Sequence, residues 1–76
     1  MKENKRTALA IFIKARRKML RINQVELAEK AGVGLRFVRD MEQGKASLRM
    51  DKVNDVLRLF GHELGPVAMD RDKLLP

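Results

Sequence analysis

Two short amphipathic runs within residues 23–45 constrain the fold of this chain most strongly, because only a few residues separate them. The residues between them, 31–34, are Ala-Gly-Val-Gly. Glycine readily takes the left-handed conformation in which many helices end. Just before the first run, Asn23 and Glu26 have the spacing of a capping box, which satisfies free backbone N–H groups at a helix start. The pattern therefore predicts two short helices joined by a tight turn.

Apolar residues recur at helical spacing over most of the chain and predict an all-α domain of four helices, with no strand in the core. The expected helices cover residues 7–20 or 7–21, 24–31, 35–43 and 50–60. Glycines at 32, 44 and 61 follow the last three. The side chains expected on the inner faces are Leu9, Ile13 and Leu20, with Phe12 and Met19 beside them, Leu27, Ala28 and Ala31, Val38 and Met41, and Val53, Val56, Leu57 and Phe60.

The chain is small, with 76 residues, no cysteine and one histidine. Such a length supports a single, marginally stable domain, and pairing of two copies is a common source of additional stability. We therefore expect a homodimer. Disulfides and thiolate metal sites are excluded, and no metal site or cofactor is expected. Because no cysteine nucleophile, phosphate-binding loop or second histidine is present, we expect no catalytic residue and no enzymatic activity.

The positive charge is concentrated near the N-terminus. Lys and Arg number 17 against 10 Asp and Glu, a net charge of +7, and residues 1–21 account for all of it with eight basic residues and one acid. A concentrated basic face indicates a polyanionic partner, either nucleic acid or an anionic membrane surface. The apolar stretch 8–13 is too short for a membrane span and is closed by Lys14, so we expect neither span nor signal peptide, and a cytoplasmic protein.

The helix expected at 35–43 has two distinct faces. At about 100° per residue, Val38 and Met41 point inward, and a polar set points roughly the opposite way: Arg36, Arg39, Asp40 and Gln43. The second helix of such a pair can enter the DNA major groove, where arginine binds guanine through two hydrogen bonds. Arg36 is the first candidate for that contact, and Arg39 for a base or a phosphate. Gln43 belongs to the same DNA-facing set.

Other candidate DNA contacts flank these arginines. Leu35 is placed to touch a thymine methyl, and Phe37 lies on the other flank, as a DNA or dimer contact or as a packing residue against the preceding helix. The helix start at Gln24 presents free N–H groups to a phosphate, and Gln24 itself can donate. Gly44 and Lys45 can contribute a backbone N–H and an ammonium group on the other side of the groove.

Several of these residues together resemble the Cro/lambda-repressor-like (XRE) helix-turn-helix family over about residues 13–64. The matching positions are Arg17, Gln24 with Glu26-Leu27-Ala28, Ala31-Gly32-Val33, and Val38 with Met41-Glu42-Gln43-Gly44-Lys45. The resemblance implies that Gln24 contacts a phosphate and that Arg17 forms a structural ion pair with Glu42. Gly34 departs from the pattern, because the family commonly has a Ser or Thr there that caps the recognition helix and touches phosphate.

The ending Leu-Phe-Gly-His-Glu-Leu-Gly, residues 59–65, is similar within that family to HipB-type antitoxins. This resemblance implies a homodimer joined by a C-terminal strand, repression of its own operon and binding of a HipA-like kinase toxin. We expect residues 62–69 to form the dimerisation segment through Leu64, Val67 and Met69. A loosely packed tail is the other interpretation. Residues 7–61 form the DNA-binding domain, and 1–6 and 70–76 are expected to be disordered.

The leading hypothesis is a sequence-specific transcriptional repressor that binds double-stranded DNA as a homodimer and acts as the antitoxin of such an operon. A stand-alone regulator of the XRE type is the nearest alternative. A protein-interaction module on the same fold is another, suggested by the apolar Leu35 and Phe37. A membrane-surface protein is the third alternative, and it leaves the residues after Arg21 unexplained.

Overall fold

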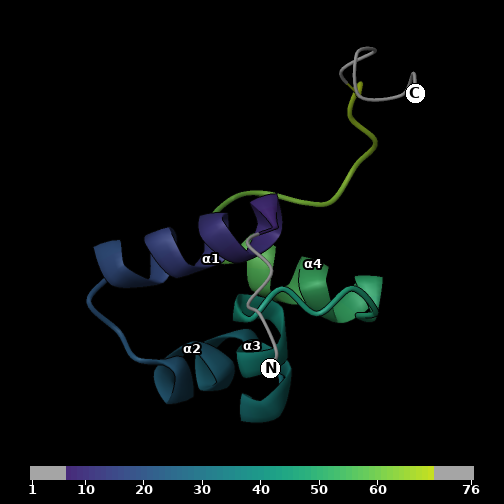
Figure 1. Cartoon of the computed structure of the whole chain (residues 1–76). Coiled ribbons are helices and arrows are strands. Elements are labelled where there is room, and N and C mark those ends of the chain that lie inside the picture. The colour runs from purple at the N-terminus through teal and green to yellow at the C-terminus, as the bar shows by residue number, and fades with distance from the viewer. Residues whose placement is uncertain (1–6, 70–76) are drawn as a thin grey trace, which may run out of the picture.

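A computed structural model describes residues 7–69 and contains four α-helices there (Figure 1). These are α1 (Ala8–Met19), α2 (Gln24–Ala31), α3 (Leu35–Glu42) and α4 (Met50–Arg58). No strand occurs among the described residues, and the all-α helix-turn-helix prediction is confirmed. The two segments predicted to be disordered, 1–6 and 70–76, lie outside this range.

The helices surround one small core. α2 packs on both α3 and α4, and α3 also packs on α1. The buried cluster contains Ile13 from α1, Leu27 and Ala28 from α2, Val38 and Met41 from α3, and Val53, Val56 and Leu57 from α4. All eight were predicted from their helical spacing. Ala31 and Phe60, also expected to be buried, are only partly buried at the edge of this cluster.

The prediction of an inward-facing Leu20 is wrong. Leu20 is 54% exposed, and Met19 beside it is 71% exposed. Leu20 lies seven residues after Ile13 and so shares its side of the helix. However, α1 ends at Met19, and Figure 1 shows that its C-terminal end extends beyond α2. The apolar face is therefore covered at Ile13 and uncovered two turns later.

Side-chain capping sets the starts of α1 and α2. The Oγ1 of Thr7 accepts a hydrogen bond from the N–H of Ala10 at 3.0 Å and begins α1. At α2 the Oδ1 of Asn23 accepts from the N–H of Glu26, and the Oε1 of Glu26 accepts from the N–H of Asn23, both at 2.8 Å. The predicted capping box is confirmed.

All four helices end in the same arrangement, a Schellman motif. In each, a residue with positive φ follows the helix, and the next N–H donates to the carbonyl five residues earlier at 3.0–3.3 Å. The residues with positive φ are Arg21, Gly32, Gly44 and Gly61. Because the turn tightens before this residue, α1, α3 and α4 end one or two residues earlier than predicted.

The chain after α4 returns to α1. The Phe12 ring lies 6.3 Å from that of Phe60 in a T-shaped contact and 4.7 Å from that of His62. The N–H of Leu64 donates to Oδ1 of Asn54 at 2.8 Å. These contacts attach residues 60–64 to the domain. No helix among the described residues is long and apolar enough to cross a membrane.

Candidate nucleic-acid interface

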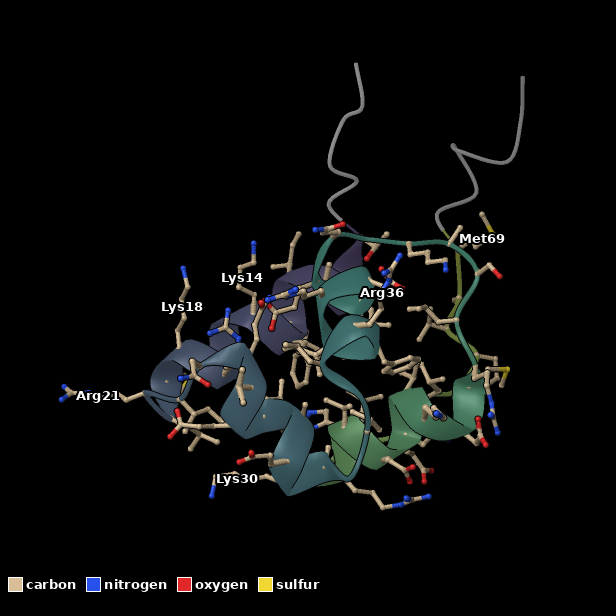
Figure 2. All side chains as sticks on the ribbon, turned by 90° about the horizontal axis from the view of Figure 1, so that it is seen from below. Lys14, Lys18, Arg21, Lys30, Arg36 and Met69 are labelled. Atoms are coloured by element: carbon tan, nitrogen blue, oxygen red, sulfur yellow. The ribbon has the colours of Figure 1, made fainter. Side chains whose placement is uncertain are left out.

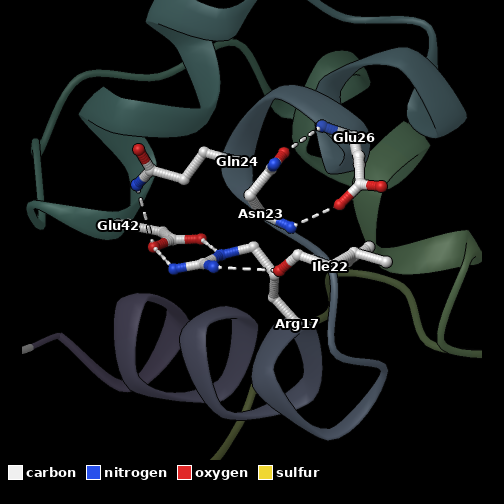
Figure 3. Close-up of polar contacts among 6 residues, drawn as sticks. All are labelled: Arg17, Ile22, Asn23, Gln24, Glu26 and Glu42. Carbon is white, nitrogen blue, oxygen red and sulfur yellow. Dashed lines mark hydrogen bonds and ion pairs between the residues drawn. The ribbon is translucent and has the colours of Figure 1, made fainter.

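A buried ion pair joins the first and third helices (Figure 3). The guanidinium of Arg17 donates from Nε to Oε2 of Glu42 at 2.7 Å and from Nη2 to Oε1 at 2.9 Å. Its Nη1 donates to the carbonyl oxygen of Ile22 at 3.1 Å. The two side chains are 13% and 2% exposed. The structure thus brings together the two residues for which the family resemblance implied an ion pair.

Gln24, the first residue of α2, joins the same network. Its Nε2 donates to Oε1 of Glu42 at 3.1 Å (Figure 3). Glu42 therefore connects α1, the start of α2 and the end of α3. Since the hydrogen bonds to a charged group are the stronger ones, this network holds the two helices of the motif in a fixed relation. The Gln24 amide is oriented by a protein contact, at the helix end where a phosphate contact was predicted.

The environment of Glu42 favours its charged form. Burial raises the pKa of Glu42, but hydrogen bonds from Arg17 and Gln24 and the nearby charges of Arg17 and Lys14 outweigh it and lower the pKa below the ordinary value of 4.5. The hydrogen bond to Glu42 correspondingly raises the pKa of Arg17, with burial opposing it. The pair is therefore fully ionised near neutral pH.

The outer face of α3 is polar and open. Val38 and Met41 are fully buried, whereas Arg36, Arg39 and Gln43 are exposed, as predicted from the helical spacing. Asp40, which we expected on the same outer face, is half-buried, and its Oδ2 lies 3.6 Å from Nζ of Lys45. Arg36 is thus left as an exposed cation near the start of α3, and Figure 2 shows its side chain extending from that helix.

The start of α3 is capped by backbone alone. Gly34 is the N-cap residue with φ −76° and ψ 154°, and no side chain caps the helix. A Cβ at this position would meet no atom within 4 Å. Leu35 is half-buried, and so is Phe37, which packs at the edge of the core. The packing interpretation of Phe37 therefore has structural support, and its proposed DNA contact is limited to the exposed part of the ring.

The predicted dimerisation residues differ in exposure. Leu64 packs at the edge of the core of its own chain. Val67 and Met69 are 85% and 63% exposed, and residues 64–69 have no regular secondary structure. The structure therefore separates Leu64 from the other two. Within residues 7–69, no group of three or more His, Cys, Asp or Glu side chains could hold a metal ion.

The geometry is that of two helices joined by a tight turn, with the second exposing a polar face. The helix-turn-helix family model matches residues 13–65. The chain belongs to the helix-turn-helix family. It is the XRE type that the sequence motifs indicated, a family of DNA-binding regulators.

One relative of this helix-turn-helix chain comes from Sinorhizobium fredii (strain NBRC 101917 / NGR234). It is described as the uncharacterized HTH-type transcriptional regulator y4mF. The two are 42% identical over 60 residues, which cover 79% of this chain and 79% of the relative. No solved structure matches the chain significantly.

Two features of the site were not foreseen from the sequence. The hydrogen bond from Gln24 to Glu42 joins residues 18 positions apart, and no local pattern indicates it. The approach of Lys45 to Asp40 was also missed, although both residues stand at the end of the third helix. Opposite charges five residues apart across a helix-ending glycine were the available signal.

Proposed function

We propose that this helix-turn-helix protein is a sequence-specific transcriptional repressor that binds an operator in double-stranded DNA as a homodimer. The observation that supports this most is the position of α3. Its inner face is buried, its outer face exposes Arg36 and Arg39, and the Glu42 network holds it to α1 and α2. A rigidly held helix with an open, basic outer face suits the major groove.

The DNA contact proposed for each residue follows from the chemistry of its side chain. Arg36 binds guanine through two hydrogen bonds, Leu35 touches a thymine methyl, and Arg39 contacts a base or a phosphate. Gln24, Gly34, Gln43 and Lys45 contact the phosphate backbone, which sets the register without reading sequence. Phe37 contributes through its exposed ring edge. The relative's description as a transcriptional regulator supports this class of function.

The finer proposal is that the protein is a cytoplasmic antitoxin that represses its own operon and binds a HipA-like kinase toxin. Its support is the HipB-like ending at residues 59–65 and the exposed apolar side chains of Val67 and Met69 that follow it. A stand-alone regulator without a toxin is the second candidate, supported by the relative's description. An interaction module that does not read DNA is the third, since Leu35 places an apolar group near the recognition face.

Substitution of Arg36 tests operator recognition. We expect Arg36→Ala to lower affinity for the protein's own promoter by about 1–3 kcal/mol per half-site while leaving affinity for scrambled DNA nearly unchanged. Lys45→Ala is the matched control, since it removes one exposed cation that contacts phosphate and weakens both duplexes about equally. Fluorescence anisotropy with both duplexes measures the difference. Equal losses for the two duplexes in Arg36→Ala would remove Arg36 as the base-reading residue.

A pull-down from the native host, with bound proteins quantified, tests the antitoxin proposal. We expect a kinase-like protein in stoichiometric amount. Recovery of only the protein's own copies and DNA would contradict the antitoxin role and support a stand-alone regulator. Absence of any preference for the protein's own promoter would instead support the interaction module.

A further inference from the structure

We propose that Lys14, Lys18 and Arg21 form a second DNA-contacting surface, here called the basic row, which binds backbone phosphates flanking the half-site that α3 reads. The inference rests on the proposed function and extends it, because it concerns how much DNA each protomer contacts. The basic row recognises phosphate charge and carries no sequence information.

Lys14 and Lys18 share one side of α1, since they are four residues apart, the spacing of neighbours on a helix surface. Arg21 lies beyond the helix, two residues after its last residue Met19, and extends the row at that end. All three are exposed. In Figure 2, Lys14 and Lys18 extend toward the same edge of the molecule as Arg36, Arg21 lies at the end of α1, and Lys30 lies at the opposite edge.

No carboxylate among residues 7–69 forms an ion pair with the basic row. The four ion pairs found there join Arg17 to Glu42, Lys45 to Asp40, Arg49 to Asp51 and Arg58 to Asp55. Glu42 is the carboxylate whose pKa the charge of Lys14 helps to lower, and it is buried against Arg17. The row therefore keeps a solvent-facing positive charge that an external anion can neutralise.

The row also borders the expected phosphate contacts. It begins beside the Glu42 network and ends at Arg21, two residues before Asn23, which caps α2. Gln24 is the next residue. Phosphates that follow the one contacted at the start of α2 would thus meet a continuing positive surface.

Arg21 has a backbone conformation that is unfavourable for its side chain. Its φ is 58°, and it is the one non-glycine residue among residues 7–69 with positive φ. The equivalent positions after α2, α3 and α4 are all glycine. Residues held in this region against their preference are concentrated at functional sites. Positive charge near the C-terminal end of a helix is favourable, but Arg21 is not needed to supply it. Arg16, Arg17 and Lys18 already occupy the last turn of α1.

The chemistry favours DNA over a membrane. Lys is a flexible point charge that suits phosphate better than a base edge. A membrane-surface helix must bury an apolar face in the bilayer. The central part of the apolar face of α1 is already used, because Ala10 and Ile13 are buried inside the domain, and this leaves Met19 and Leu20 at its C-terminal end as the uncovered part.

The test compares two double variants of the full chain that lose the same charge. Lys14→Gln/Lys18→Gln removes two members of the row. Lys30→Gln/Arg58→Gln is the control, with both side chains exposed in the last turns of α2 and α4. Affinities are measured by anisotropy over 50–200 mM salt. The probes are a short duplex of the promoter half-sites, the same duplex with long flanks, and a scrambled long duplex.

We expect the row variant to bind both long duplexes about tenfold more weakly at 150 mM salt, with a salt slope shallower by about 0.9 for each phosphate that the variant no longer neutralises. On the short duplex it should match the wild type, and the control variant should match the wild type on all three. Equal losses in the two variants would overturn the proposal, because net charge would then suffice to explain them. Binding of the wild type but not the row variant to anionic vesicles, with unchanged DNA affinity, would also overturn it.

Arg21 gives an independent test with two readouts. Arg21→Gly should leave the midpoint of thermal unfolding unchanged or raise it, while weakening binding to the long duplexes; Arg21→Lys should retain that binding. Lower thermal stability with unchanged affinity would assign Arg21 a purely structural role and overturn its place in the row. If the wild type bound the promoter and scrambled long duplexes equally, while Lys14→Gln/Lys18→Gln bound both more weakly, operator recognition would be contradicted. The basic row would still be supported.

Discussion

Glu42 is the buried charge at which the first three helices meet. Its carboxylate accepts hydrogen bonds from Arg17 and Gln24, and no buried side-chain nitrogen or oxygen in the described part of the chain lacks a partner. Removing one member of such a pair leaves the other charge poorly compensated. The network therefore specifies the position of α3, and its loss would cost both stability and DNA recognition.

We expect Glu42→Gln to lower the free energy of unfolding at pH 7 by about 3 kcal/mol, because Arg17 stays largely buried without its counter-charge. The control Asp55→Asn breaks an exposed pair and should cost less than about 1 kcal/mol. Urea unfolding of both variants measures the difference. Similar losses in the two variants would show that the buried Glu42 pair contributes no more to the free energy of unfolding than an exposed pair.

The same pair gives the protein a defined sensitivity to acid. Because folding lowers the pKa of Glu42, its contribution to stability is complete above the ordinary value of 4.5 and is lost as the pH falls through the lowered folded pKa. The stability difference between wild type and Glu42→Gln should accordingly shrink in unfolding experiments below pH 4.5. A difference that stays constant down to pH 3 would contradict this assignment.

At the scale of the helix, α3 combines a firmly held C-terminal end with a weakly capped start. Glu42 anchors the end, while Gly34 caps the start without a side chain. Packing does not require a glycine at this position, because a Cβ added there would meet no atom within 4 Å. The start of α3 is thus a place where stability and phosphate binding can both be increased.

We expect Gly34→Ser to stabilise the domain by a few tenths to about 1 kcal/mol, since φ −76° suits any residue and the hydroxyl can accept from a free N–H of α3. The same hydroxyl should donate to a phosphate and tighten binding to all DNA sequences. Gly34→Ala is the control for the added Cβ and should be about 1 kcal/mol less stable than the serine variant. Equal thermal unfolding of the two variants would exclude capping.

At the scale of the whole molecule, the segment after α4 has an attached half and a free half. Residues 60–64 contact α1 through the packing of Phe60 and His62 on Phe12. They contact α4 through the hydrogen bond from the N–H of Leu64 to Asn54. Val67 and Met69 extend their apolar side chains into solvent. An exposed apolar segment next to a firmly attached one suits pairing with a second copy across a two-fold axis.

We expect Val67→Asp/Met69→Asp to convert the proposed dimer into a monomer without loss of helix content, because neither side chain belongs to the core of its own chain. Met19→Asp/Met50→Asp is the control, with two similarly exposed methionines elsewhere and the same added charge. Sedimentation velocity and circular dichroism measure the two properties. A dimer that survives in the tail variant would place the interface on another surface.

Local sequence sufficed for the helices and for most of the core. Apolar residues at three- and four-residue spacing, with the Asn23–Glu26 capping box, act within a few residues of one another. These patterns depend on residues close together in the chain, so they can be recognised in the sequence without knowledge of the packing. The outward position of Arg36 and Arg39 follows from the same periodicity once Val38 and Met41 are assigned to the core.

Only the packing of the helices established the remaining features. Leu20 has the spacing of a core residue but no neighbour to cover it, because α1 extends past α2. The Gln24–Glu42 hydrogen bond and the Phe12–His62 contact join residues far apart in the chain. Helical periodicity in the sequence predicts which side of a helix is apolar. Which part of that side is covered, and which distant polar groups meet, depends on where the other helices lie in space.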